Sequence, residues 1–241
     1  MGGYCDLHCH ILYGVDDGAQ TVEDARALIE GAYLSGTRTI CFTPHYNPFR
    51  KLDSAGAEET FRTFSAEMKE TYPDLTLCLG AEILYHQKIA DSLSRGACRT
   101  LNGTRFVLIE FLPDDEGSHI VQSLETVAAR GYTPILAHAE RYHSFLRHPK
   151  YALMLAEQEI PIQLNVRSVI GENGKIVKKF CLRLLKEGAA AVIASDAHDP
   201  EYADARLSEG FRMVSDKFGP EYATTIFCRM PRIFLGLDPN G

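Results

Sequence analysis

The sequence predicts a single α/β domain over residues 1–241, built as a barrel of about seven strand–helix units. Short apolar runs alternate with segments of helical periodicity, which is typical of parallel strands joined by right-handed crossovers. Several of these runs are apolar on both faces, as strands covered on both sides must be. No linker or low-complexity segment divides the chain. An open, doubly wound sheet is the alternative that the same pattern leaves open.

Seven runs have the composition of buried strands. The first is YCDLHC near the start, and the others lie at about 37–43, 75–80, 105–111, 132–138, 160–166 and 189–195. The first helix begins at Thr21, which forms a capping-box pattern with Asp24, and it ends at Gly36. Further helices are predicted at 57–71, 118–130, 149–159 and 175–187, the last closed by Gly188, with two more after residue 202.

Composition and charge exclude several classes of function. The net charge of −7, without a basic run, argues against a general binder of nucleic acid or acidic membranes. The seven cysteines are scattered, mostly inside apolar runs, which favours buried thiols in a reducing cytoplasm over a disulfide framework. No apolar run approaches 18 residues, so a membrane span and a secretory signal are not expected.

Nearly every predicted strand delivers an acidic or imidazole side chain at its carboxyl end. These residues are Asp6, His8, His10, His45, Glu82, Glu110, His138, Asp196 and His198. In a closed parallel barrel the carboxyl ends of the strands meet at one rim. Unpaired charges buried there would cost several kcal/mol each, and divalent cations remove that cost. Mixed imidazole and carboxylate ligands suit Mn, Fe or Zn, and so many of them suggest two or three ions.

Each motif is weak alone, and their conjunction carries the prediction. The HCH motif arises by chance in many strands, and Asp196 in SDAH has an alternative role as a helix cap. Four other histidines lie in segments that read as loops or helices and are expected at the surface or in packing: His86, His119, His143 and His148. Cys5 and Cys9 alternate with the first two histidines and are expected to pack on the opposite face of the strand.

The ordered motifs DLHCH, TPH, GAE, IEF, HAER and SDAH resemble those of the polymerase and histidinol phosphatase (PHP) family of metal-dependent phosphoesterases. The segments HCHILYGVDDGAQTVEDA, GAEILYH, LIEF, AHAERY and ASDAH resemble its bacterial tyrosine-phosphatase branch, which is associated with capsule and exopolysaccharide synthesis. The likeness runs from about Tyr4 to the PRIFLG tail. It implies a distorted (β/α)7 barrel with a trinuclear centre that often holds manganese.

The resemblance also implies roles for individual residues. Glu82 becomes the natural bridging carboxylate, and Asp6 a neighbour that steadies an imidazole. The implied metal ligands are His8, His10, His45, Glu82, Glu110, His138, Asp196 and His198. The chain departs from the family pattern at Ala139, Val166 and Arg167, and Arg167 can alter substrate choice or add a phosphate contact.

Closely spaced cations lower the pKa of a bridging water, which yields hydroxide near neutral pH to attack phosphorus. An arginine beside the metals adds a bidentate phosphate contact. Arg141 in AHAER is the first candidate, and Arg206 is a weaker one because it lies farther from His198 than the family pattern has it. Both have structural salt bridges as the alternative. Asp17 in VDDG is the candidate proton donor to the leaving phenolate, with a turn residue before Gly18 as the alternative.

The cysteines argue against the other common route to phosphotyrosine hydrolysis. A thiolate phosphatase needs an arginine six places after its cysteine, and none of the seven cysteines has one. We therefore expect chelation to abolish activity and thiol alkylation to spare it.

Three functions remain at this point. The leading one is a metal-dependent protein-tyrosine phosphatase whose substrate is the tyrosine-rich tail of a bacterial kinase that regulates capsule or exopolysaccharide synthesis. The second is a small-molecule phosphatase such as histidinol-phosphate phosphatase, which requires a deeper and more enclosed pocket. The third is a metal-binding module without catalysis.

Overall fold

The computed structural model describes residues 3–49, 54–199 and 206–239. All of its strand pairs are parallel, as the alternating pattern predicts. The strands are β1 (Tyr4–Cys9), β2 (Thr37–Phe42), β3 (His45–Tyr46), β4 (Thr76–Leu79), β5 (Glu82–Leu84), β6 (Phe106–Glu110), β7 (Thr133–Leu136), β8 (Gln163–Asn165) and β9 (Val192–Ala194).

Two strand positions are each interrupted, which leaves a lower piece toward the amino end and an upper piece toward the carboxyl end. Only two residues, including Pro44, separate β2 from β3, and Gly80 lies in the equally short break between β4 and β5. The lower pieces pair in the order β1-β2-β4 and the upper pieces in the order β3-β5-β6-β7. Proline has no amide hydrogen to donate to a strand ladder, which accounts for the first break. The second half of each split strand carries a predicted metal ligand.

The strands close into a ring. A bridge between Leu136 and Ile162 joins β7 to the start of β8, and a bridge between Cys9 and Ala197 joins the end of β1 to the segment after β9. With β8 paired to β9, every strand position has two neighbours. Counting each split strand once gives seven positions, so the predicted distorted (β/α)7 barrel is confirmed and the open sheet is not.

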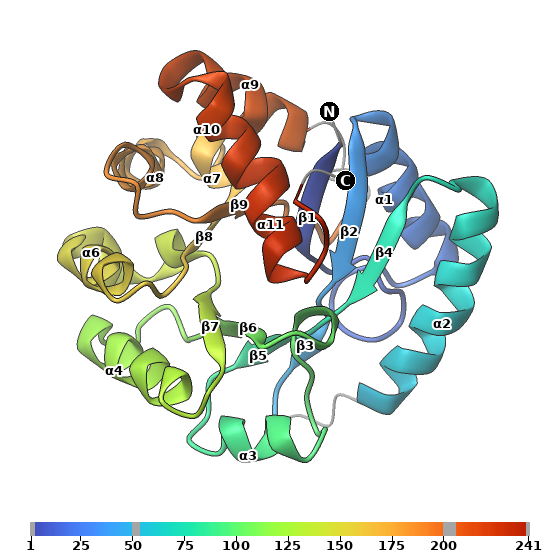
Figure 1. Ribbon diagram of the computed structural model, residues 1–241, viewed down its shortest axis with the longest axis horizontal. Helices are drawn as coiled ribbons and strands as arrows, with labels where there is room; N and C mark the ends of the chain where they lie inside the picture. Colours follow the sequence, from blue (N-terminus) through green and yellow to red (C-terminus); the bar gives the residue numbers. More distant parts are fainter. Residues whose placement is uncertain (1–2, 50–53, 200–205, 240–241) are drawn as a thin grey trace.

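Helices surround this ring, as Figure 1 shows. The longer ones are α1 (Val22–Leu34), α2 (Ser54–Thr71), α4 (Gly117–Ala128), α6 (Lys150–Glu157), α8 (Lys175–Lys186) and α9 (Arg206–Phe218). Shorter ones are α3 (Ile89–Ser94), α5 (His143–Arg147), α7 (Val166–Ile170), α10 (Pro220–Thr224) and α11 (Met230–Phe234). No described helix combines the length and the apolarity that crossing a bilayer requires.

Helix α1 illustrates why the sequence folds as predicted. The Thr21 side chain accepts from the Asp24 amide and the Asp24 carboxylate accepts from the Thr21 amide, which completes the expected capping box. Leu28 and Ile29 face the core on one side of the helix, where each contributes roughly 1.5–3 kcal/mol by burial. Gly36 follows the helix end at a φ of 104°, a conformation that glycine adopts without strain.

The two cysteines of the first strand pack as expected. Cys5 and Cys9 are fully buried, and they belong to two different apolar clusters. Cys9 packs with residues of α1, whereas Cys5 packs with Leu7 and Leu108 toward the end of the barrel that α11 covers. All seven cysteines are free and buried.

Candidate metal centre

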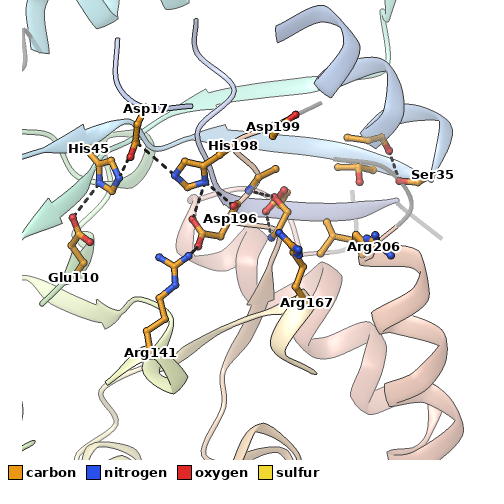
Figure 2. Close-up of a pocket in the computed structure, with 16 residues that line it drawn as sticks. Asp17, Ser35, His45, Glu110, Arg141, Arg167, Asp196, His198, Asp199 and Arg206 are labelled. Carbon is orange, nitrogen blue, oxygen red and sulfur yellow. Dashed lines mark hydrogen bonds and ion pairs between the residues drawn. The ribbon is translucent and has the colours of Figure 1, made fainter. Parts of the chain in front are cut away.

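The structure brings all of the predicted metal ligands together at the carboxyl ends of the strands. His8 and His10 come from the end of β1, His45 from β3, Glu82 from β5 and Glu110 from β6. The last three, His138, Asp196 and His198, follow β7 and β9. Figure 2 shows His45, Glu110, Asp196 and His198 lining one pocket with Asp17 and Arg141.

Glu82 lies at the middle of this cluster. Its Oε2 atom is 3.3 Å from His8 Nε2, 3.2 Å from His10 Nε2 and 3.1 Å from His45 Nδ1. Its Oε1 atom is 2.6 Å from His138 Nε2. One buried carboxylate therefore touches four imidazoles, which is the position that a bridging ligand between two cations needs.

The remaining carboxylates extend the cluster in two directions. Asp196 Oδ1 lies 3.4 Å from His8 Nε2 and 3.5 Å from His10 Nε2. On the other side, Glu110 Oε1 lies 3.1 Å from His45 Nδ1. Three overlapping groups of ligand atoms are close enough to hold an ion each: His10, Asp17, His45 and His198; His8, His10 and Glu82; and His45, Glu82 and Glu110.

Hydrogen bonds orient the imidazoles toward the centre. His10 Nδ1 lies 2.8 Å from Asp16 Oδ2, His8 Nδ1 lies 3.1 Å from Gln163 Oε1, and His198 Nδ1 lies 2.9 Å from the Asp196 carbonyl oxygen. Each partner is an acceptor, so each ring donates from Nδ1 and turns Nε2 toward the other candidate ligands. This orientation is the one that metal ligation by Nε2 requires.

The charges in the cluster shift the pKa values of its members. Burial alone lowers the pKa of His45, but Glu110 and Glu82 outweigh it and raise the pKa to about 10. Burial likewise disfavours charge on Asp16, yet its hydrogen bond to His10 lowers the pKa of the Asp16 carboxyl to about 2. Burial opposes charge on Glu82 and Asp196 as well, but His8 and the neighbouring imidazoles lower the pKa of both carboxyls, which keeps them negative at neutral pH as cation binding requires.

Two buried oxygens indicate that the cluster fits cations. Glu82 Oε2 and Asp196 Oδ1 have no hydrogen-bond donor in suitable geometry among the described residues, although imidazole nitrogens lie within 3.5 Å of each. A buried carboxylate oxygen without a donor costs several kcal/mol unless a positive charge meets it. Mixed imidazole and carboxylate donors fit Mn, Fe or Zn in such a place.

The backbone at two of the ligands is strained. His138 has a φ of 30° and Asp196 a φ of 54°, in the left-handed region that costs a residue other than glycine about 1–2 kcal/mol. The second carboxylate oxygen of Asp196 is held by Arg141 Nη2 at 2.7 Å and by Asn165 Nδ2 at 2.6 Å. These contacts hold the strained residue in the orientation that turns its other oxygen toward the imidazoles.

The predicted catalytic residues line the same pocket but differ in their contacts. Arg141 reaches Asp196 with one nitrogen and is half exposed. Asp17 lies 3.4 Å from His45 Nε2 and 73% of its side chain is exposed, so it stands between the ligands and solvent. Arg206 lines the pocket wall, where its Nη1 forms an ion pair of 2.7 Å with Glu172 Oε1.

Sequence reasoning missed three residues that support the centre. Asp16 holds His10, and Gln163 and Asn165 on β8 hold His8 and Asp196. Strand β8 has no acidic or imidazole residue that would mark it as part of a metal site. Its QLN motif places two amide side chains on alternate positions, and this pattern could have indicated hydrogen-bond partners for the ligands.

The role expected of Asp6 needs correction. Its Oδ1 atom accepts from the backbone amides of Ser195, at 3.0 Å, and His8, at 3.4 Å. It thus ties β1 to the segment that carries Asp196, while Asp16 and Gln163 steady the imidazoles. The physical reason is that the Asp6 carboxylate lies within reach of these two backbone amides, which it satisfies in place of a ring nitrogen.

A seven-position parallel barrel whose rim gathers imidazoles and carboxylates defines a barrel protein with a candidate metal site. The chain belongs to the CpsB/CapC family of capsular polysaccharide synthesis, whose family model matches residues 4–236. It is 30% identical to the tyrosine-protein phosphatase CpsB of Streptococcus pneumoniae over 94% of this chain and 96% of that protein. It is 31% identical to the tyrosine-protein phosphatase YwqE of Bacillus subtilis, over 90% and 85%.

Solved structures agree with the sequence relatives. A crystal structure from work on YwqE of Bacillus subtilis and CpsB of Streptococcus pneumoniae, described as unique metal-dependent tyrosine phosphatases, matches with a TM-score of 0.89 and 28% identity. The match covers 97% of this chain and 95% of that one. A histidinol phosphate phosphatase from Lactococcus lactis matches with a TM-score of 0.58 at 15% identity, which shows a shared fold. The resemblance drawn from the motifs is confirmed.

Proposed function

We propose that this chain is a metal-dependent protein-tyrosine phosphatase, a hydrolase of phosphoric monoesters. The observation that carries the proposal is the convergence of eight imidazole and carboxylate residues, Glu82 among them, at the rim of the barrel. Whole-length similarity to tyrosine-protein phosphatases CpsB and YwqE supports the same activity. A ring of strands that runs from β1 to β9 supports a single catalytic domain.

The metal ligands are the eight residues predicted from the sequence. Their mixture of imidazole and carboxylate donors, with no thiolate among them, supports manganese, with iron or zinc as alternatives. Bound divalent cations supply a hydroxide nucleophile at neutral pH and stabilise negative charge on phosphoryl oxygens. Asp16 and Gln163 keep His10 and His8 in the ligating tautomer.

The residues above the ligands handle the substrate. Arg141 carries free donors on its exposed side and binds phosphate oxygens, while its contact with Asp196 fixes its position beside the ligands. Arg206, held by Glu172, adds positive charge at the pocket wall. Asp17, exposed and next to His45, donates a proton to the departing phenolate oxygen.

The exposed mouth of the pocket supports phosphotyrosine in a protein as the substrate, and the burial of the thiols supports a route to its hydrolysis without a cysteine nucleophile. Asp17 and Arg141 are exposed at the mouth, which suits a side chain presented by another protein, such as the tail of a bacterial tyrosine kinase in capsule synthesis. The cysteines are buried, and burial raises the pKa of Cys98 to about 12, so a thiolate nucleophile is not available. Free thiols throughout also support a reducing cytoplasm.

The test compares substrates and inhibitors on the purified protein. We expect turnover of a phosphotyrosyl peptide to exceed that of histidinol phosphate, to stop on chelation and to return with manganese. Thiol alkylation leaves it intact. Asp196→Asn and His138→Ala abolish turnover while the circular dichroism spectrum stays native. Preference for histidinol phosphate would select the small-molecule alternative, and stoichiometric metal without turnover would select the non-catalytic module.

A further inference from the structure

A second groove lies next to the metal centre, over α3 and the loops after β3 and β5. We call it the basic groove and define it by six of its lining residues: Phe49, Tyr85, His86, Lys88, Arg95 and His119. None of them is among the proposed metal ligands or the residues proposed to handle the phosphate.

The basic groove continues from the opening of the metal centre. That opening is lined by Asn47, Leu84 and Phe111 beside His45 and Glu110. The chain runs directly from Asn47 to Phe49 and from Leu84 to His86, so the same two loops line both hollows. The rings of Tyr85 and Phe111 stack at 5.0 Å between their centroids and form a shared floor. An extended peptide with one residue at the metals therefore has a path into the basic groove.

The charge of the groove is opposite to that of the whole chain. The protein carries a net charge of −7, yet the described residues that line this groove include Lys88 and Arg95 and no carboxylate. Within the described residues, neither Lys88 nor Arg95 has a carboxylate partner within 4.0 Å, and Arg95 Nε donates to the backbone oxygen of Asp91. Their charges remain available to an acidic ligand.

The two aspartates that follow the lining residues Leu112 and Pro113 are engaged in local contacts. Asp114 pairs with His143 at 2.8 Å, and Asp115 accepts from the Leu112 amide at 2.9 Å. Negative charge on a bound segment is favoured at the α3 side of the opening, because Lys88 and Arg95 lie there.

The groove and opening also expose apolar side chains. Phe49 is 79% exposed in the groove and Leu112 is 57% exposed at the opening. An Asn47 side chain that accepts from the Phe49 amide at 2.9 Å holds this loop in a turn. His86 Nε2 is buried without a hydrogen-bond partner among the described residues. Exposed aromatic surface next to an unpaired polar atom is typical of a site that binds a side chain or peptide.

We propose that the basic groove binds the residues that flank phosphotyrosine in the protein substrate, and that it selects acidic and aromatic flanking residues. The proposal rests on the phosphatase function proposed above. Lys88 and Arg95 attract the acidic side chains, while Phe49 and Tyr85 provide a surface on which an aromatic side chain packs. The groove thereby distinguishes a protein substrate from a small phosphate ester, which occupies the metal centre alone.

The test reverses the charge of the groove with Lys88→Glu/Arg95→Glu. Its matched control is Lys179→Glu/Lys186→Glu, which makes the same change in net charge on the exposed side of α8. Each protein is assayed with p-nitrophenyl phosphate and with three phosphotyrosyl peptides whose flanking residues are glutamate, alanine or lysine. Thermal melting establishes that both variants are folded.

We expect the wild type and the control to prefer the glutamate-flanked peptide. The groove variant should show a KM for that peptide raised about tenfold with kcat unchanged, since two rim charges each change from attraction to repulsion. It should favour the lysine-flanked peptide, and its turnover of p-nitrophenyl phosphate should stay within about twofold of wild type. Phe49→Ser should raise KM for peptides with a flanking tyrosine and leave the ester unaffected.

Two outcomes separate the failure of this proposal from that of the phosphatase function. If the groove variant keeps the wild-type order of preference among the three peptides, the groove does not bind the flanking residues. The same conclusion follows if the control variant changes that order equally. If the wild type hydrolyses the ester and no phosphotyrosyl peptide at all, the protein-substrate function itself is wrong.

Discussion

Replacement of Asp16 by asparagine tests whether the hydrogen bond behind His10 sets metal affinity. The Asp16 carboxylate is almost fully buried and accepts three N–H groups. Its Oδ2 atom accepts from His10 Nδ1 at 2.8 Å and from the His45 amide at 3.0 Å, and its Oδ1 atom accepts from the Gly18 amide at 3.0 Å. An asparagine has one acceptor oxygen, so it cannot serve both sides.

The expected loss of metal affinity in Asp16→Asn follows from these contacts. If the amide oxygen of asparagine keeps His10 and His45, its NH₂ group faces the Gly18 amide and leaves a buried donor unpaired, at a cost of about 1–3 kcal/mol. The bond to His10 also loses its charge, which weakens it by about 1 kcal/mol and makes the imidazole a poorer ligand. A loss of about 2 kcal/mol in metal binding corresponds to roughly thirty-fold weaker affinity, within the 10–100-fold range for partners of ligating histidines.

The assay is a titration of chelated protein with buffered manganese, read by activity on a phosphotyrosyl peptide and by metal content. Asp16→Asn should need about thirty-fold more free metal for half-maximal activity and regain most of kcat at saturation. Asp24→Asn is the control, because Asp24 also accepts a backbone amide but lies in the capping box of α1, away from the ligands. It should cost at most about 1 kcal/mol of stability. Equal metal affinity of Asp16→Asn and wild type would refute the reasoning.

Two further substitutions probe the same region. Gly18→Ala would bring its Cβ into the backbone oxygen of His10 and within 2.5 Å of His10 Cβ, so it should cost about 1–3 kcal/mol of stability and lower metal affinity, measured by denaturant unfolding and by metal titration. Arg141→Lys keeps the charge but loses the planar fork, so kcat/KM for the phosphopeptide should fall about tenfold while metal stoichiometry persists, as metal analysis would show. Loss of the metal in the second variant would mean that its contact with Asp196 matters more than its contact with phosphate.

The convergence of the candidate ligands could be predicted because barrel geometry fixes where the carboxyl end of each strand lies. A His, Asp or Glu at the carboxyl end of a parallel strand can only point to the common rim, so strand order and spacing suffice. His45 and Glu82 show the limit of that reasoning. Each lies on a short upper strand, β3 or β5, that the sequence pattern did not predict, since the predicted strands end at about residues 43 and 80. The structure places both side chains at the rim, as expected, although the breaks that create these short strands were not predicted.

The supporting contacts could not be predicted because they depend on loop geometry. VDDG contains two adjacent aspartates, and the sequence does not indicate which of them contacts a histidine of the cluster from behind. Only the fold determines that Asp16 turns inward to His10 while Asp17 stays exposed. The amides of Gln163 and Asn165 carry no charge that would mark them as partners of a metal ligand. Their role depends on the pairing of β8 with β9, which joins residues about thirty positions apart.

The imidazoles and carboxylates of the cluster neutralise one another, so we expect the protein to fold without metal. We also expect a rise in pH to lower the stability of the metal-free protein and to raise the stabilisation that metal provides. The carboxylates raise the pKa of His45 from its ordinary 6.5 to about 10, so in the chelated protein this ion pairing contributes fully below pH 6.5 and is lost as pH rises through 10. Metal binding instead displaces the proton, so affinity rises with pH. Urea unfolding of chelated protein should give a lower free energy at pH 9.5 than at pH 6.5, whereas added manganese should stabilise the protein more at pH 8 than at pH 6.5. A chelated chain that is already unfolded at pH 7 would mean that the imidazoles and carboxylates do not neutralise one another, and that cations are needed to build the rim.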